Sequence, residues 1–211
     1  MSDLSIKLCG VRSVRDARLC AEAGADELGV VFAKASKRCV SLGQAREIHE
    51  SLAPVPALIG VFQDATLYEL QIAANAGILA ALQLHGARPA GLFEMPLGLP
   101  LHFALQITDA DSLTQLDELD PSLVARILLD GPRGGSGKTF DWRLVREARK
   151  RFAGPLHLAG GLTPENVAEA VAIAAPDGVD VSSGVEGPDG LKAPERVRAF
   201  IEAARAAVPY L

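Results

Sequence analysis

The chain has 211 residues, 49% of them hydrophobic, and its 21 basic and 26 acidic side chains give a net charge of −5. This length suits one large domain or two small ones, and the apolar content is sufficient for a sizeable core. A mildly acidic chain without basic clusters argues against a nucleic-acid partner.

The start of the chain, MSDLSIKLCG, lacks the basic and apolar segments of a signal peptide. No apolar run reaches the roughly 18 residues that span a bilayer, so no membrane partner is expected. The three cysteines, Cys9, Cys20 and Cys39, are odd in number and have no CxxC spacing. We therefore expect a reduced, cytoplasmic protein with no disulfide framework, no metal and no cofactor.

Short, nearly continuous apolar runs recur along the whole chain. Runs of this kind are typical of parallel strands that are buried on both faces of a sheet. We predict a strand at residues 5–10, 27–32, 57–62, 80–85, 101–105, 126–130, 156–160 and 178–183.

Amphipathic stretches separate several of these runs. Helical patterns cover residues 13–24, 41–52, 163–175 and 193–208. Ser41 is the expected N-cap of the second helix. Thr163 is the expected N-cap of the third, with Pro164 at its first helical position. Residues 87–100 are rich in Pro and Gly, so any helix after the fourth strand must be short.

The alternation of eight strands with about eight helices gives roughly 26 residues for each strand–helix unit. This rhythm favours an α/β fold of the (β/α)8 TIM-barrel type, as a single compact domain over residues 1–211. The competing architecture is an open, doubly wound sheet, which prefers a glycine-rich turn after its first strand. Here the first strand ends in LCGVRS, without the G-x-G-x-x-G pattern.

Polar residues stand at the carboxyl ends of the predicted strands, where barrels of this type place their chemistry. Because successive strand residues face opposite sides, Lys7 and Cys9 share one face, as do Gln83 and His85. Lys7 lies one layer below Cys9 and is expected to form a buried ion pair with Asp180. For His85, a substrate contact and a structural hydrogen bond remain equally open. Cys9 taken alone would more often be a core thiol.

Two glycine-rich turns follow the last two strands, LAGGL at 158–162 and SSGVEG at 182–187. Loops at these two places often bind phosphate in barrels, because small residues let backbone N–H groups approach the oxygens. The sequence therefore predicts a phosphate site between these turns.

A third glycine-rich stretch, LLDGPRGGSGKTFDW at 128–142, is similar to a nucleotide-binding P-loop. A P-loop needs glycine five positions before the glycine that precedes Lys138, and Pro132 occupies that position. We instead interpret 131–139 as the loop over the barrel mouth after a strand that ends in Asp130. Asp141 would cap the next helix, and Phe140 and Trp142 would anchor the loop.

Taken together, these motifs resemble those of the phosphoribosylanthranilate isomerase family of tryptophan biosynthesis. The resemblance extends over nearly the whole chain. It rests on KLCGVRSVRDA (7–17), GADELGVVF (24–32), SKR (36–38), IGVF (59–62), LQLHG (82–86), LLD with GGSGKTFDW (128–142), AGGLTPENV (159–167) and VDVSSGVEG (179–187).

The resemblance implies an isomerase that converts N-(5-phosphoribosyl)anthranilate to 1-(2-carboxyphenylamino)-1-deoxyribulose 5-phosphate by an Amadori rearrangement. It makes Asp130 the general acid and Cys9 the general base, and it places the substrate carboxylate on Arg38. Gln83, His85 and Gly135 are then expected to contact the substrate. The expected phosphate-binding residues are Gly160, Gly161, Asp180, Ser182, Ser183 and Gly184.

An acid and a base at neutral pH both need shifted pKa values, because a free Asp is ionised there and a free Cys is largely protonated. We expect the mouth of the barrel to raise the pKa of Asp130. We expect the phosphate-binding end to help hold Cys9 as a thiolate.

The sequence departs from the family pattern in places that concern substrate binding and loop stability. Lys37 stands where the family often has Pro, Gln63 replaces a common Asn, and Ala193 replaces an Asp. The fifth strand lacks a lysine that is often found there.

Three alternatives remain beside this interpretation. The first is another phosphosugar-binding barrel enzyme, such as a histidine-pathway aminoaldose isomerase or an indoleglycerol-phosphate synthase. These would need an Asp in place of Cys9, or a catalytic lysine. The second is a non-catalytic phosphosugar-binding paralogue, and the third is a nucleotide-binding protein, which the P-loop spacing disfavours. The sequence leaves open whether the chain is a monomer or a homodimer.

Overall fold

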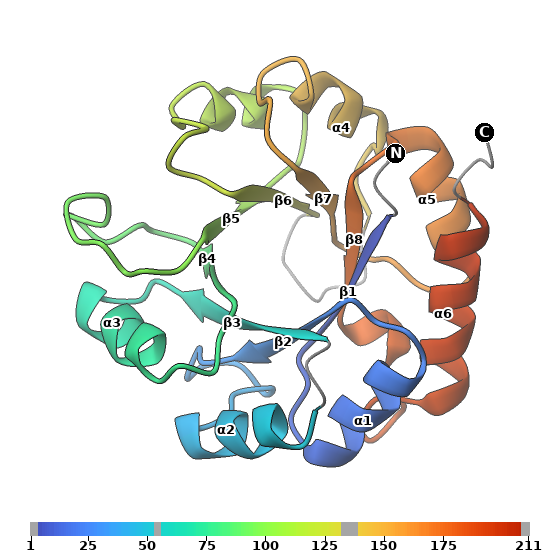
Figure 1. Ribbon diagram of the computed structural model, residues 1–211. Helices are drawn as coiled ribbons and strands as arrows, with labels where there is room; N and C mark the ends of the chain where they lie inside the picture. The colour runs from blue at the N-terminus through green and yellow to red at the C-terminus, as the bar shows by residue number, and fades with distance from the viewer. Residues whose placement is uncertain (1–3, 53–55, 132–138, 208–211) are drawn as a thin grey trace.

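The computed structural model describes residues 4–52, 56–131 and 139–207, and within them the chain forms a closed barrel of eight parallel strands. The strands follow one another around the barrel in chain order, and β1 closes the ring against β8 (Figure 1). This confirms the (β/α)8 TIM barrel and excludes the open doubly wound sheet.

Each predicted strand is present, with ends that shift by a few residues at most. The strands are β1 (Ser5–Cys9), β2 (Glu27–Val31), β3 (Ala57–Gln63), β4 (Ala81–His85), β5 (Leu101–Gln106), β6 (Arg126–Asp130), β7 (Leu156–Leu158) and β8 (Gly178–Val181).

The helical layer is less regular than the rhythm of the sequence predicts. The described residues contain α1 (Val14–Glu22), α2 (Leu42–Glu50), α3 (Leu67–Asn75), α4 (Arg143–Ala148), α5 (Val167–Ala174) and α6 (Pro194–Ala206). A 3₁₀ helix, η1 (Asp111–Leu116), connects β5 to β6, and another, η2 (Ser183–Val185), follows β8. Residues 86–100, all of them described, connect β4 to β5 through turns without a helix.

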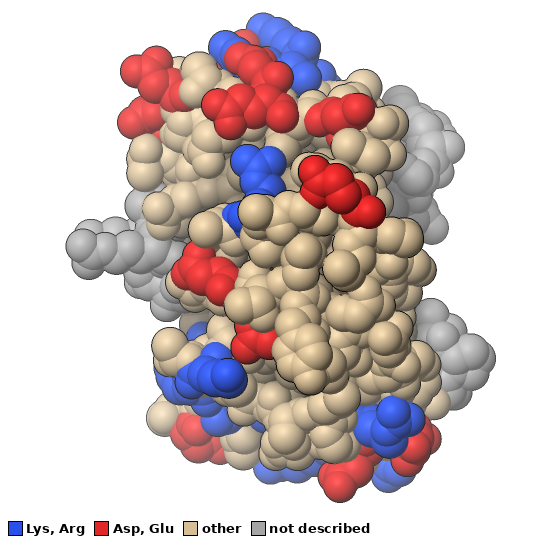
Figure 2. All heavy atoms as spheres, turned by 90° about the vertical axis from the view of Figure 1, so that its left-hand side faces the viewer, with Lys and Arg blue, Asp and Glu red and all other residues tan. Residues whose placement is uncertain are grey.

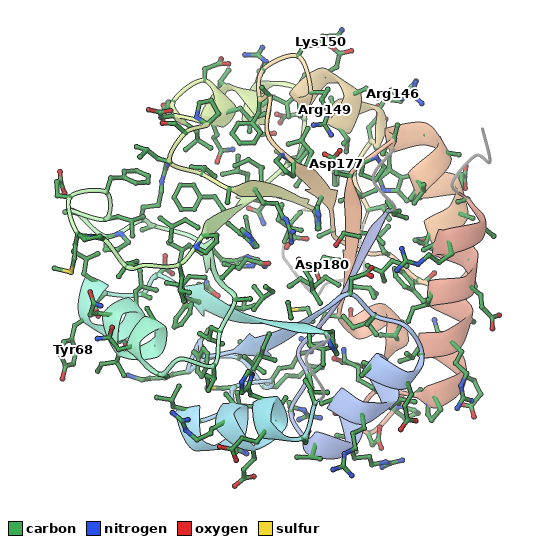
Figure 3. All side chains as sticks on the ribbon, in the orientation of Figure 1. Tyr68, Arg146, Arg149, Lys150, Asp177 and Asp180 are labelled. Atoms are coloured by element: carbon green, nitrogen blue, oxygen red, sulfur yellow. The ribbon has the colours of Figure 1, made fainter. Side chains whose placement is uncertain are left out.

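The interior of the barrel contains ion pairs as well as apolar side chains. In the parallel register, Lys7 on β1 stands beside Asp180 on β8. The Lys7 ammonium lies 2.8 Å from the Asp180 carboxylate, so the predicted buried pair is confirmed. Arg126 on β6 reaches across to Glu27 on β2 through two hydrogen bonds of 2.6 and 2.9 Å. Figure 3 shows Asp180 inside the barrel, whereas Tyr68 and Lys150 point outward.

The helix starts depend on local capping. As expected, Ser41 caps α2, and it forms a capping box with Gln44. The expectation for α5 is wrong. This helix begins at Val167, with Asn166 rather than Thr163 at its N-cap, so Pro164 is not its first helical residue. The side chain of Asn166 instead accepts a hydrogen bond from the Thr163 N–H, and its amide donates to the Gly161 carbonyl, which stabilises a turn before the helix.

The segment after the mouth loop is anchored as expected. Phe140 is buried in the core, and Trp142 packs against it. The Asp141 carboxylate accepts the Arg143 N–H at 3.0 Å at the start of α4, although Trp142 occupies the N-cap position itself.

One face of the molecule combines α3 with the β4–β5 connection. Its middle is largely free of charged side chains, which gather toward its upper and lower margins (Figure 2). Tyr68 and Ile72 of α3, and Phe93 and Met95 of the connection, are large apolar side chains that remain exposed.

Ala175 generates a prediction about stability. It ends α5 in the left-handed conformation, at φ 48° and ψ 54°, which costs a residue with a Cβ about 1–2 kcal/mol. We expect Ala175→Gly to raise the free energy of unfolding by about 0.5–1 kcal/mol in urea titrations, because glycine avoids this strain. Ala203→Gly, inside α6, is the matched control and should lower it by about 1 kcal/mol. Equal destabilisation by both would contradict the expectation.

Candidate active site

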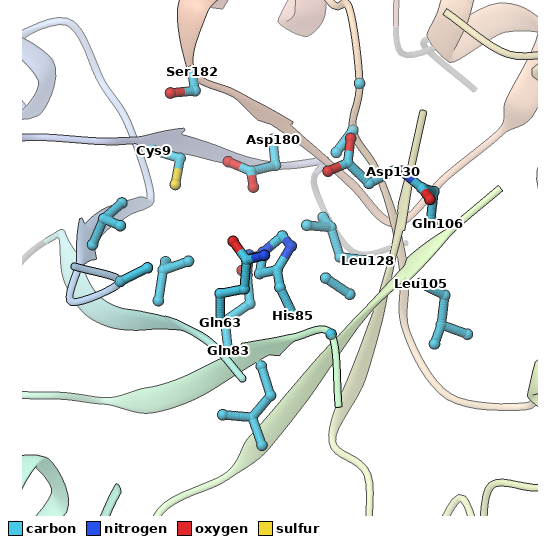
Figure 4. A pocket seen from close by; sticks show the side chains of 18 of the residues that line it. Cys9, Gln63, Gln83, His85, Leu105, Gln106, Leu128, Asp130, Asp180 and Ser182 are labelled. Carbon is cyan, nitrogen blue, oxygen red and sulfur yellow. Dashed lines mark hydrogen bonds between the residues drawn. The ribbon is translucent and has the colours of Figure 1, made fainter. Parts of the chain in front are cut away.

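A cavity of about 740 Å³ opens at the carboxyl ends of the strands (Figure 4). Loops and strand ends from around the whole barrel contribute to it, as the fold predicts. Its lining includes Cys9, Arg38, Gln63, Gln83, His85, Gln106, Asp130, Gly160, Gly161, Asp180, Ser182, Ser183 and Gly184.

Three of these residues lie in a row across the mouth. Figure 4 shows Cys9 on one side, Asp130 on the other and Asp180 between them. The row follows from the fold, because β1, β8 and β6 supply the three side chains from neighbouring parts of one half of the ring. The expected thiol and carboxyl group therefore face the same cavity from different sides.

The carboxyl group of Asp130 has the raised pKa that we expected. Burial, and then the negative charge of Asp180, raise the pKa of Asp130 to about 6, against the opposing effects of the Gly131 N–H and Lys7. About a tenth of this carboxyl group is therefore protonated at pH 7, far more than for a free Asp, and it can donate a proton.

The thiol of Cys9 behaves differently from our expectation. Burial raises the pKa of Cys9 above its usual value, and the nearby charge of Lys7 lowers it only in part. We expected this end of the barrel to hold Cys9 as a thiolate. The protein's own groups do not do so, because burial raises the pKa of Cys9 more than the Lys7 ammonium lowers it. The resting form of Cys9 is the thiol.

Lys7 and Asp180 form a buried ion pair that acts on both Cys9 and Asp130. Burial alone would lower the pKa of Lys7, but the Asp180 carboxylate raises it, so the lysine stays charged. Asp180 was expected near the phosphate. Its carboxylate lies between Cys9 and Asp130 (Figure 4), in the cavity that the two glycine turns also line, and its place near the phosphate stays a prediction.

Gln83 and His85 form a pair on β4. The Gln83 side-chain nitrogen lies 2.8 Å from Nε2 of His85. Burial, and then Lys7, lower the pKa of His85 to about 4, so its ring is neutral at neutral pH. With the Gln83 amide donating to Nε2, the ring proton is on Nδ1. Both residues line the cavity, as expected.

The two predicted glycine turns come together at the mouth beside Asp130. Gly160 has a φ of 85°, and a Cβ there would lie 2.2 Å from the Gly131 nitrogen and 2.9 Å from the Asp130 carboxylate. Only glycine therefore lets the turn after β7 pack against the end of β6. Ser182, Ser183 and Gly184, at and after the end of β8, line the cavity beside this turn.

Arg38 also lines the cavity, and an acidic partner holds it. Its Nε and Nη2 donate to the two carboxylate oxygens of Glu186 at 2.5 and 2.8 Å. Gly135, the remaining expected substrate contact, lies outside the described residues.

The sequence-based analysis did not find two residues of the site, Gln106 and Glu186. Gln106 ends β5 next to Asp130 in the sheet register, and it faces the cavity. The alternation along β5 could have indicated it. Glu186 contacts Arg38 from 148 residues away, and no local pattern indicates that pairing.

The part of the chain that the structure describes lacks two further features. It contains no group of three or more His, Cys, Asp and Glu side chains that could hold a metal ion. It also contains no helix that is long and apolar enough to cross a membrane.

The fold and the site together define the class of protein, a (β/α)8-barrel enzyme whose candidate site holds a carboxyl group and a thiol at the open end of its barrel. The family described as N-(5'phosphoribosyl)anthranilate (PRA) isomerase matches residues 6–203. The chain belongs to this family.

Individual relatives agree with that assignment. An N-(5'-phosphoribosyl)anthranilate isomerase from Geotalea daltonii is 44% identical over 204 residues, which is 95% of this chain and 96% of the relative. A crystal structure of phosphoribosyl anthranilate isomerase from Thermotoga maritima has a TM-score of 0.87 and 36% identity, and covers 96% of this chain and 99% of its own. A second, in complex with reduced 1-(o-carboxyphenylamino)-1-deoxyribulose 5-phosphate, has a TM-score of 0.85, 34% identity and the same coverage.

The raised pKa of Asp130 predicts a pH-dependent effect on stability. Because the folded pKa lies above the unfolded value, the ionised side chain destabilises the fold as pH rises from about 4 through about 6. Asp130→Asn cannot ionise. Its free energy of unfolding should equal that of the parent near pH 4 and exceed it by up to about 3 kcal/mol at pH 8. Urea titrations at the two pH values measure this, and a difference that does not change with pH would refute it.

Proposed function

We propose that this chain converts N-(5'-phosphoribosyl)anthranilate to 1-(o-carboxyphenylamino)-1-deoxyribulose 5-phosphate, with Asp130 as general acid and Cys9 as general base. The single observation that supports these roles most is the pairing of a carboxyl group of pKa about 6 with a buried thiol across one cavity. Membership of the family supports the reaction in this proposal, and the geometry of the cavity supports the roles of the two residues.

Asp130 acts in the first step. It donates its proton to the ring oxygen of the ribose, the C1–O bond breaks, and the nitrogen lone pair forms the C1=N bond of a Schiff base. The acid must be protonated for this step, and burial together with Asp180 favours that form.

Cys9 acts in the second step. Its thiolate takes the proton from C2, the C–H electron pair forms a C1=C2 bond, and the electron pair of the C1=N π bond returns to nitrogen, which gives a neutral enolamine. The enolamine then tautomerises, with a proton moving to C1 and a ketone forming at C2. The charge of Lys7 lowers the pKa of Cys9 more than that of any other cation, and the charge of Lys192 adds to this effect.

The protonation state of Asp130 and Cys9 that reacts is a minority of the molecules. The reaction needs protonated Asp130 together with ionised Cys9, but Asp130 is the stronger acid of the two. Most molecules at neutral pH therefore hold the reverse arrangement, a carboxylate and a thiol. Opening of the sugar ring brings positive charge to C1=N, and this charge favours the thiolate of Cys9.

The two ends of the substrate are bound by different loops in this proposal. The phosphate lies against the backbone of Gly160, Gly161, Ser182, Ser183 and Gly184, whose small side chains allow close approach. The carboxylate binds the guanidinium of Arg38, which suits a planar anion.

Gln83 and His85 contact the sugar between these two ends, and Gly135 closes over it from the mouth loop. Asp180 lies near the phosphate in this proposal, and its charge also raises the pKa of Asp130.

The surroundings of the protein are also part of the proposal. We propose a single domain over residues 1–211 and a cytoplasmic location, which fits the three free thiols. The partner is a small phosphosugar, and neither nucleic acid nor membrane is required. A relative from Thermotoga maritima is described as dimeric. For this chain we propose a monomer or a homodimer, which sedimentation velocity distinguishes.

The catalytic roles predict the effect of two substitutions. Cys9→Ser and Asp130→Asn should each lower kcat by about 10²–10⁴-fold, because each removes one proton transfer. The loss of phosphoribosylanthranilate fluorescence measures turnover. Cys39→Ser and Asp111→Asn, at exposed positions, are matched controls and should retain full activity. Absence of turnover in the parent would leave only a phosphosugar-binding paralogue.

The pH–rate profile tests the protonation states. Because the reactive form has the same total number of protons as the carboxylate–thiol form, kcat/KM should rise with pH through about 6. It should fall again as pH rises through the raised pKa of Cys9. In Asp130→Asn the residual activity should lose the rise near pH 6. A rise that persists unchanged would assign that group elsewhere.

A further inference from the structure

Arg38 is held by a carboxylate that does not itself line the cavity. Glu186 accepts hydrogen bonds from Nε and Nη2 of Arg38, at 2.5 and 2.8 Å. Both side chains are largely buried, with 13% of Arg38 and 5% of Glu186 exposed. Two parallel bonds between planar groups fix the plane of the guanidinium as well as its position. Nη1 has no hydrogen bond to any described residue, so it remains available on the cavity side.

Glu186 belongs to a short hairpin after η2. It forms an antiparallel bridge with Lys192, and the Gly187 N–H donates to the Leu191 carbonyl at 2.9 Å. The ammonium of Lys192 is buried, 3.0 Å from the Ser182 carbonyl and 3.5 Å from the Glu186 carboxylate. Lys192 therefore connects the residue that holds Arg38 to the backbone of a glycine turn at the mouth.

Further contacts tie the hairpin to the loop that bears Arg38. Arg12 donates to the Gly190 carbonyl at 2.6 Å and to the Lys37 carbonyl at 3.3 Å. The stem of Arg38 also packs on the backbone of Gly10, where a Cβ would lie 2.4 Å from Cδ of the arginine. The guanidinium thus has little freedom to move while Glu186 is in place.

We propose that Glu186 is a positioning residue that orients Arg38 for the carboxylate of the substrate, with Lys192 anchoring it to the phosphate-binding turn. The hairpin 186–192 then sets the distance between the two anion-binding ends of the site. This inference rests on the role proposed above for Arg38.

Charge alone predicts the opposite effect of removing Glu186. Arg38, Glu186 and Lys192 together have a single positive formal charge, and Glu186→Gln adds a second one. If the group acted only through its net charge, this substitution would tighten the binding of an anion. If Glu186 acts by orientation, the substitution weakens binding, because the guanidinium loses one strong hydrogen bond and its fixed plane.

The test compares two ligands in four proteins and, as the conservative variant, in a fifth, Glu186→Asp. The ligands are reduced 1-(o-carboxyphenylamino)-1-deoxyribulose 5-phosphate and the same compound without the carboxylate, with affinities measured by calorimetry. The proteins are the parent, Glu186→Gln, Arg38→Met and, as the matched control, Glu147→Gln, which alters an exposed carboxylate paired with Lys150. KM and kcat for the substrate are measured alongside.

We expect Glu186→Gln to lower the affinity for the carboxylated ligand about 10-fold, which corresponds to roughly 1.4 kcal/mol of binding free energy. The affinity for the ligand without the carboxylate should change by less than about 2-fold. KM should rise while kcat stays near the parent value, as for lost ground-state binding. Glu186→Asp, which keeps the charge, should recover part of the affinity, and it replaces Glu186→Gln if that protein does not fold. Glu147→Gln should match the parent.

Other outcomes overturn the inference in distinguishable ways. Unchanged or tighter binding in Glu186→Gln, with weaker binding in Arg38→Met, rejects the positioning role but keeps Arg38 as the anchor. No carboxylate-dependent loss in either variant rejects both roles. Equal weakening of both ligands in Glu186→Gln indicates general damage to the site and also rejects positioning. A parent that binds the ligands without turnover contradicts the proposed catalysis while leaving this comparison valid.

Discussion

The buried ammonium of Lys7 is the charge on which the rest of the site depends. Only 1% of its side chain is exposed, and a charge in that position needs a counter-charge, which Asp180 supplies at 2.8 Å. That counter-charge then acts on Asp130, whose pKa it raises, while the ammonium lowers the pKa of both Cys9 and Asp130. A single ion pair on the seam between β1 and β8 thereby modifies the pKa values of Asp130 and Cys9, both of which burial raises most.

A second ion pair crosses the barrel and constrains it in a different way. Arg126 on β6 and Glu27 on β2 are four strands apart in the ring, so their bidentate contact spans the interior. A shift of the strand register by one residue turns every side chain to the other face of the sheet. Such a shift would separate Arg126 or Glu27 from its partner and leave a buried charge unpaired. The ion pairs inside the barrel therefore favour one strand register. Apolar side chains alone would specify this register less strictly.

The amino-acid sequence predicts the parts of this structure that depend on local periodicity. Alternation placed Cys9 and Lys7 on one face, capping chemistry identified Ser41, and the glycine turns marked the loops after β7 and β8. Thr163 failed as a cap because the nearby side chain of Asn166 forms a competing turn. Glu186 was not predicted, since its contact with Arg38 depends on ring closure between distant segments. The pKa of Cys9 is raised rather than lowered as predicted, because the effect of burial exceeds that of the Lys7 charge. No local sequence pattern indicates how deeply a side chain is buried.

The connection between β4 and β5, which has no helix in its described residues 86–100, divides the barrel into two halves of unlike content. The first half contributes the thiol, Arg38 and the Gln83–His85 pair. The second contributes Asp130, both glycine turns, Asp180 and Glu186. Two ion pairs of the site join one half to the other, Lys7 with Asp180 and Arg38 with Glu186. Neither half on its own is a smaller version of the enzyme, so any ancestor or engineered fragment built from one half must acquire the missing groups from a second chain.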